Sequence, residues 1–149
     1  MGLSEAQKKA LVFFAQKLKE FPIQWVLVGS ANLALQGVKI SVNDINIATN
    51  NDDIFHIKNI FSDYCLRGIT RSKQDADILL CKLKIYGIDI LILGDSKSKI
   101  YTRYFETPLI EKRYFLGEWI PCLDLEMELR NYRLVGMKDK VDVLKEFLK

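Results

Sequence analysis

A short apolar segment that ends in a glycine restricts the fold of this chain more than any other feature. Residues 25–28 are continuously apolar, and Gly29 and Ser30 follow at the start of a short helical segment. Such a run is typical of a buried strand, and glycine allows a sharp turn from strand to helix. A helix that begins with a capping box at Ser4 and Gln7 precedes this strand. The chain therefore begins with a helix, a buried strand and a second helix.

The following segments predict a sheet with helices around it. Residues 42–48 alternate apolar and polar side chains, which predicts a strand with one buried and one polar face. Residues 77–86 and 88–93 predict an antiparallel hairpin, and a smaller hairpin is expected around Gly117. Apolar residues at helical spacing predict two final helices. The pattern indicates an α/β (α+β) fold, a mixed β-sheet flanked by helices, with two C-terminal helices.

Length and composition limit the class of protein. We expect 149 residues to form a single domain, 1–149, with its core at about 22–95 and its C-terminal helical part at about 122–149. No apolar run approaches the length of a membrane helix, so no membrane span is predicted. The scattered Cys65, Cys81 and Cys122 fit neither a disulfide framework nor a zinc site. We interpret them as core residues of a cytoplasmic protein.

The charge balance permits binding of nucleotides without requiring it. The formal net charge is +3, whereas proteins that bind duplex nucleic acid usually carry a concentrated basic stripe. An RNA-binding module is therefore the least favoured class. Lys97, Lys99 and Arg103 are candidates for contact with phosphate or RNA, although a solvated loop is the favoured interpretation.

Three groups of residues carry candidate chemistry. Gly29 and Ser30 stand at a strand-to-helix junction, where free N–H groups favour phosphate, although many ordinary turns contain this pair. Thirteen residues later, Asp44 and Asn46 share one face of a strand, and hard cations such as Mg²⁺ bind oxygen pairs of this kind. Asp89 lies within an apolar strand, where a charge needs a cation or a donor. The alternative for Asp89 is a structural ion pair with Lys82 or Lys84.

The order and spacing of these residues resemble the nucleotidyltransferase superfamily of the polymerase-beta type. The family pattern is a hydrophobic residue followed by Gly-[Gly/Ser], nine to thirteen residues, Asp-h-[Asp/Glu]-h, and a third acid on a neighbouring strand. Gly29, Ser30, Asp44 and Asp89 match it. The resemblance covers roughly residues 24–93, continues more loosely to about residue 142, and includes the string from 29 to 37 that is similar to the small single-domain members.

The resemblance implies a reaction that uses two metal ions. Asp44, Asn46 and Asp89 would hold Mg²⁺ against a nucleoside triphosphate, and Gly29 and Ser30 would bind its terminal phosphates. Asp44 and Asp89 would be the catalytic residues, with Asp89 helping to deprotonate the acceptor hydroxyl. That oxygen would attack the α-phosphorus as pyrophosphate leaves. The acceptor is left open among a small molecule, a tRNA and a protein side chain.

Position 46 departs from the family pattern, because Asn46 stands where the second carboxylate is expected. An amide oxygen can bind Mg²⁺, but one negative charge is lost. The alternative function is therefore a weakened or inactive relative that binds a nucleotide or acts as an antitoxin-like partner protein. Such a protein would form a homodimer or bind a helical toxin or antitoxin partner.

Overall fold

The computed structural model describes residues 2–73, 77–95 and 110–149. Within them, seven strands form one sheet in the order β3-β4-β5-β2-β1-β7-β6. β1 pairs with β7 and β2 pairs with β5 in parallel, and the other neighbours are antiparallel. The strands are β1 (Trp25–Val28), β2 (Ile45–Thr49), β3 (Cys65–Arg71), β4 (Ile78–Ile85), β5 (Ile88–Asp95), β6 (Ile110–Phe115) and β7 (Glu118–Leu123).

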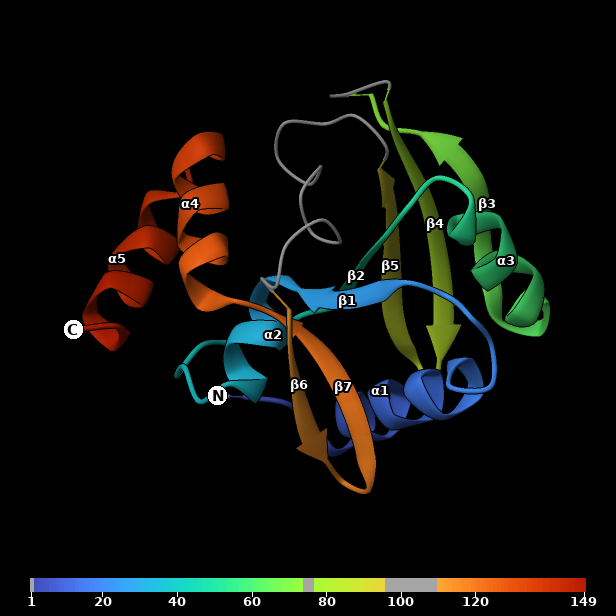
Figure 1. The fold of residues 1–149 in the computed structure, drawn as a ribbon, viewed down its shortest axis with the longest axis horizontal. Helices are drawn as coiled ribbons and strands as arrows, with labels where there is room; N and C mark the ends of the chain where they lie inside the picture. The colour runs from blue at the N-terminus through green and yellow to red at the C-terminus, as the bar shows by residue number, and fades with distance from the viewer. Residues whose placement is uncertain (1, 74–76, 96–109) are drawn as a thin grey trace.

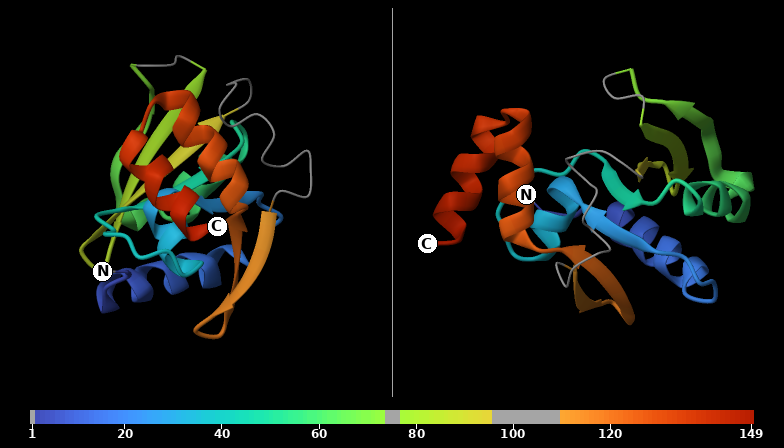
Figure 2. Two further views of the ribbon diagram at one scale, coloured as in Figure 1. Left: turned by 90° about the vertical axis from the view of Figure 1, so that its left-hand side faces the viewer. Right: turned by 45° about the horizontal axis from the view of Figure 1, so that its top comes forward.

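Helices flank this sheet, and two of them form a separate pair at the C-terminal end of the chain (Figure 1). They are α1 (Glu5–Leu18), α2 (Gly29–Leu35), α3 (Asp53–Ile60), α4 (Leu125–Val135) and α5 (Lys138–Phe147), with a short 3₁₀ helix at Ser62–Tyr64. The other views agree that α4 and α5 lie side by side at the opposite end from α3 (Figure 2). The mixed α/β fold predicted from the sequence is confirmed. No helix in the described residues is both long enough and apolar enough to cross a membrane.

The main core lies between one face of the sheet and helices α1 and α3. Phe14 of α1 is fully buried and stacks on Phe61, with ring centroids 4.9 Å apart. Ile45 and Ile47 of β2 belong to the same core. Cys81 and Cys122 are buried, as predicted for core residues, whereas Cys65 is half-buried; all three are free thiols. This packing fixes which face of β2 points away from α1 and α3.

Smaller clusters hold the C-terminal helices to the rest of the protein. Met127 of α4 packs with Val26, Val28 and Ala48 on the other face of the sheet. Leu144 of α5 is fully buried in a third cluster that joins α2, α4 and α5. Helix α4 therefore contacts the sheet on the face opposite the main core, and α5 packs on α2 and α4.

Both predicted hairpins are confirmed, but the sequence did not indicate β3. β4 and β5 pair from Ile78↔Asp95 to Ile85↔Ile88, and β6 and β7 pair across the turn at Gly117. β3 lies at the edge of the sheet, is mostly exposed, and has irregular register against β4. An exposed edge strand lacks the alternation of buried and polar residues on which the prediction of strands depends.

Candidate active site

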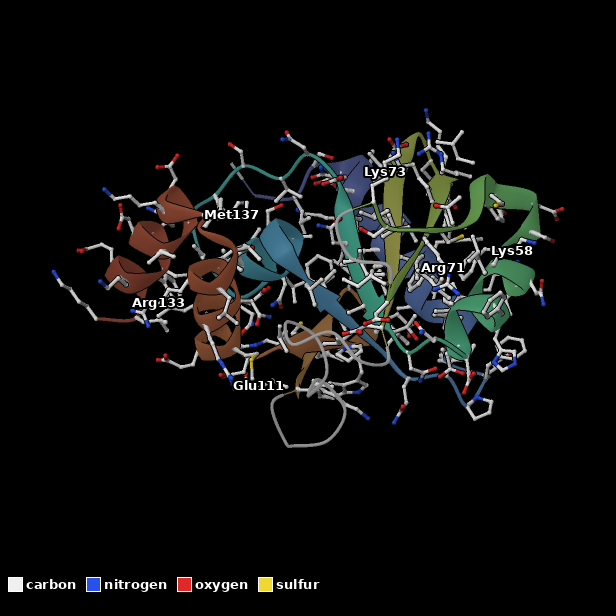
Figure 3. All side chains as sticks on the ribbon, turned by 90° about the horizontal axis from the view of Figure 1, so that it is seen from above. Lys58, Arg71, Lys73, Glu111, Arg133 and Met137 are labelled. Carbon is white, nitrogen blue, oxygen red and sulfur yellow. The ribbon has the colours of Figure 1, made fainter. Side chains whose placement is uncertain are left out.

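A cavity of about 320 Å³ lies where the ends of β1 and β2 approach α4 and α5. It brings together four residues that the sequence singled out, because Gly29 and Ser30 form one wall and Asp44 and Asn46 another. The polar and apolar residues that complete it are Val28, Ser41, Asn43, Leu93, Glu128, Asn131, Tyr132, Val135, Met137 and Lys140. In Figure 3, Met137 marks the end of the molecule at which the helix pair lies.

The turn at Gly29 requires glycine. Its φ angle is +76°, which side chains other than glycine rarely adopt, and a β-carbon there would lie 3.2 Å from Nδ2 of Asn46. Val28 pairs directly with Asn46 across the two strands. The turn and the polar face of β2 are therefore packed against each other, with no room for a side chain between them.

The alternation predicted for β2 is present and determines which residues face the cavity. Ile45 and Ile47 are fully buried in the main core, whereas Asn46 points to the other face. Asp44 precedes the first residue of β2 and lines the same cavity. Oδ1 of Asn46 is buried and accepts no hydrogen bond within the described residues. An amide oxygen without a donor is suited to a cation or to a hydrogen-bond donor of a ligand.

Asp89 lies beside this cavity rather than in its lining. Ile45 of β2 is in register with Ile90 of β5, so Asp89 immediately precedes the first paired position of β5, as Asp44 precedes that of β2. Oδ1 of Asp89 is buried without a hydrogen bond in the described chain, and Nζ of Lys84 lies 4.0 Å from it. The ion pair with Lys84 that was considered as an alternative is thus present at the limit of contact.

The predicted set of oxygen donors for Mg²⁺ includes the amide of Asn46 as well as two carboxylates. Across residues 2–73, 77–95 and 110–149, no three His, Cys, Asp or Glu side chains gather as a metal-binding group. Asn46 is the third donor in the predicted set, beside the carboxylates of Asp44 and Asp89. Lys97, Lys99 and Arg103 lie outside the residues that the structure describes.

Glu128 of α4 is a site residue that the sequence prediction missed. Its side chain is buried, and Oε2 accepts hydrogen bonds from the backbone N–H of Gly29 and from Nδ2 of Asn32, both at 2.8 Å. Burial raises the pKa of this carboxyl to about 7, although the two hydrogen bonds and the charge of Lys140 favour the ionised form. The carboxyl therefore changes charge near neutral pH.

A buried polar network extends from Glu128 to residues near the Gly29–Ser30 turn. Asn32 also donates to the carbonyl oxygen of Leu123 at 2.9 Å, and its Oδ1 accepts from Nε2 of Gln36 at 2.8 Å. Gln36 donates to the same Leu123 carbonyl. These bonds join α2, the end of β7 and α4. Because buried donors that lose their acceptors are costly, the network fixes the turn relative to the helix pair.

A sequence signal for Glu128 was available. Leu125, Leu129 and Tyr132 predict the buried face of the helix, and Glu128 lies three residues after the first of them on that face. An acid on the buried face of an amphipathic helix needs a partner. The sequence does not identify that partner, because Gly29 is 99 residues away.

We expect Glu128 to make stability depend on pH. Its pKa is about 7 in the native protein against an ordinary value of 4.5. The native state thus binds the proton more tightly, so the contribution to stability is fully present below pH 4.5 and is lost as the pH rises through 7. The loss relative to Glu128→Gln should be on the order of 3 kcal/mol, from about 1.4 kcal/mol per pKa unit. Urea unfolding of both proteins at several pH values measures it.

Glu126→Gln is the matched control, because Glu126 is an exposed residue of the same helix. Its pH dependence should follow that of the natural protein. If Glu128→Gln has the same pH dependence as the natural protein between these pH values, the carboxyl of Glu128 is not buried as described.

The chain is similar to known proteins in sequence and in fold. A family model for aminoglycoside-2''-adenylyltransferases matches residues 10–145. A protein of Thermotoga maritima assigned as a nucleotidyltransferase has a similar structure, with 27% identity, a TM-score of 0.73, and coverage of 99% of this chain and 96% of that one. No curated protein matches the chain.

Two further structures share the fold at low identity. An antigenic nucleotidyltransferase-like protein from Paracoccidioides brasiliensis is 16% identical with a TM-score of 0.62, over 96% of this chain and 77% of that one. The antibiotic-resistance factor ANT(2'')-Ia is 8% identical with a TM-score of 0.66, over 99% of this chain and 86% of that one. Because the family model spans residues 10–145, the chain belongs to the aminoglycoside-2''-adenylyltransferase family of the nucleotidyltransferase superfamily.

Proposed function

We propose that the protein transfers a nucleoside monophosphate from a nucleoside triphosphate to a hydroxyl acceptor, with Mg²⁺ and release of pyrophosphate. The observation that carries this proposal is the single cavity onto which the Gly29–Ser30 turn and the polar face of β2 both open. Phosphate binding needs backbone N–H groups and hydroxyls, and metal binding needs oxygen donors. The cavity supplies both types of group on adjacent walls.

The residues present are compatible with Mg²⁺. The carboxylate of Asp44 and the unpaired amide oxygen of Asn46 face the cavity, and Asp89 follows on the next strand. These three residues would hold the metal. The negative charge would come from the carboxylates of Asp44 and Asp89, because Asn46 is neutral. Bound Mg²⁺ would neutralise phosphate charge and stabilise the attacking and leaving oxygens.

The residues of the chain would position the substrates and move one proton. The hydroxyl of Ser30 would bind the terminal phosphates together with the backbone N–H groups that follow Gly29. Asp89 would accept the proton of the acceptor hydroxyl as its oxygen bonds to the α-phosphorus. The bond between the α-phosphorus and the bridging oxygen would break, and pyrophosphate would carry that electron pair away.

A thermal-shift titration with Mg²⁺ and each of the four common nucleoside triphosphates tests the proposal. A ligand at about one hundred times its Kd stabilises the native state by about 2.7 kcal/mol, which raises Tm by several degrees in a chain of this size. The shift should need both components and disappear with a chelator. If no triphosphate raises Tm in the presence of Mg²⁺, the proposed function is wrong.

Asn46 favours a second candidate, a relative with weakened or absent catalysis that binds a nucleotide or a protein partner. Under this alternative, triphosphates would bind without transfer to any acceptor. The protein would then act as a homodimer or as an antitoxin-like partner of another chain. Transfer of label from the α-phosphate of a bound nucleotide to an acceptor distinguishes the two functions.

Replacing Asn46 with aspartate is expected to strengthen Mg²⁺ binding about tenfold or more. The two side chains have the same shape, so Gly29 keeps its packing, while the site gains one negative charge. A gain of about 1.4 kcal/mol corresponds to a factor of ten. The Mg²⁺ concentration needed for half-maximal nucleotide binding measures the change.

Asn59→Asp is the control for Asn46→Asp, because it introduces the same charge at an exposed position of α3. It should leave the Mg²⁺ requirement unchanged. Equal Mg²⁺ requirements for the natural protein, Asn46→Asp and Asp44→Ala would show that these residues do not bind the metal.

A further inference from the structure

Lys140 of α5 gives the cavity a positive charge on the side of the helix pair. Among the described residues that line the cavity, Lys140 alone carries a cationic side chain, whereas Asp44 and Glu128 carry carboxyl groups. Without Lys140, none of the described lining residues would place a positive side chain near a bound polyphosphate. The positive charge of Lys140 therefore favours the binding of a highly charged anion in the cavity.

The packing of α5 directs Lys140 toward the cavity. Leu144 follows Lys140 by one helical turn, so the two residues share a face of the helix. Leu144 is fully buried against residues of α2 and α4, including Leu33 and Leu129. Lys138, by contrast, is exposed and does not line the cavity. The two lysines therefore provide a matched pair for comparison.

The helix pair is also fixed relative to the phosphate-binding turn. Glu128 of α4 binds the backbone N–H of Gly29, and α4 and α5 are packed together through their common cluster. Lys140 and Glu128 line the same cavity, and the positive charge of Lys140 lowers the pKa of the Glu128 carboxyl. Lys140 of α5 thus lines the same cavity as Asp44 and Asn46, which belong to the segment at the start of β2.

The stability of α5 does not explain why a lysine stands at position 140. Lys140 lies in the first turn of α5, where a cation opposes the helix dipole. Its Nζ lies 5.7 Å from the centre of the Tyr132 ring, and within the described residues it forms no ion pair with a carboxylate. An ammonium group that is half-buried and lacks an anionic partner is available to a ligand.

We propose that Lys140 binds the β- and γ-phosphates of the nucleotide, so that α5 supplies the polyphosphate-binding side of the cavity. This inference rests on the proposed function and adds a specific residue to it. A charge-assisted hydrogen bond to phosphate is worth about 1.5–3 kcal/mol. Loss of this bond corresponds to a decrease in affinity of roughly 10- to 100-fold.

Calorimetric titration of the natural protein, Lys140→Gln and Lys138→Gln with ATP, ADP and AMP, each with Mg²⁺, tests the inference. Lys140→Gln should weaken ATP binding by roughly 10- to 100-fold and AMP binding by less than about threefold, because AMP lacks the phosphates that Lys140 contacts. Lys138→Gln should bind all three like the natural protein. Circular dichroism and the Tm of each variant confirm that the fold is retained, as expected for partly exposed side chains.

Two results would overturn the role of Lys140. One is ATP binding by Lys140→Gln with the affinity of the natural protein. The other is an equal loss of affinity for ATP and AMP, which would place the lysine away from the terminal phosphates. Failure of the natural protein itself to bind any nucleotide would instead contradict the proposed function.

Discussion

Replacement of Asp44 by alanine is expected to lower nucleotidyl transfer by about a thousandfold or more. Asp44 is the carboxylate that the start of β2 presents to the cavity, and the neighbouring Asn46 is neutral. Three factors of ten correspond to about 4 kcal/mol of transition-state stabilisation, which is typical for the removal of a charge that positions phosphate and metal. Transfer of label from α-phosphate-labelled triphosphates to acceptors in a metabolite extract measures the loss.

Two further variants separate charge from folding in this experiment. Asp44→Asn keeps the shape of the side chain and should be nearly as inactive as Asp44→Ala. Asp63→Ala removes an exposed acid of the short 3₁₀ helix and should transfer label at the natural rate. If Asp44→Ala keeps more than about a tenth of the natural rate, the residue does not bind the catalytic metal.

Phe14→Ala is expected to lower the free energy of unfolding by about 3–5 kcal/mol, which is typical for truncation of a buried phenylalanine. Phe14 is fully buried, stacks on Phe61 and meets the edge of the Trp25 ring at a centroid distance of 5.2 Å. Its removal therefore leaves a cavity between α1 and the sheet that the surrounding rings cannot fill. Urea unfolding of the purified variant measures the effect.

Phe55→Ala is the control, because Phe55 is 49% exposed on α3 and should change stability by less than about 1 kcal/mol. Many domains are stable by only 5–15 kcal/mol, so Phe14→Leu serves as a milder variant of the same site. Loss of less than about 1 kcal/mol in Phe14→Ala would mean that α1 is not packed against the sheet as described.

The sequence predicted those parts of the fold in which local pattern and burial agree. The alternation at residues 45–47 placed Ile45 and Ile47 in the core and Asn46 on the polar face, and this arrangement is observed. The hairpin of β4 and β5 was also predicted, because a tight turn at Gly87 joins two apolar runs. β3 was missed because it is an exposed edge strand.

The site was predictable only in part, because its composition depends on pairings between distant segments. The spacing from Gly29 to Asp44 indicated two of the segments that line the cavity. The position of Asp89 near the start of β2 depends on the parallel register of β2 and β5, which no local pattern specifies. Glu128 and Lys140 reach the cavity only because α4 and α5 pack beside the turn.

The hydrogen bond from Gly29 to Glu128 has a consequence for attempts to shorten or transplant this protein. A chain cut after β7 would lose Glu128, leave the N–H of Gly29 without its acceptor, and remove one of the two acceptors of the Asn32 amide. Such a fragment would keep every family motif of residues 24–93 yet lack the group that holds the turn in shape. Modular reuse of this turn in another scaffold would therefore have to include an acid delivered by a separate helix.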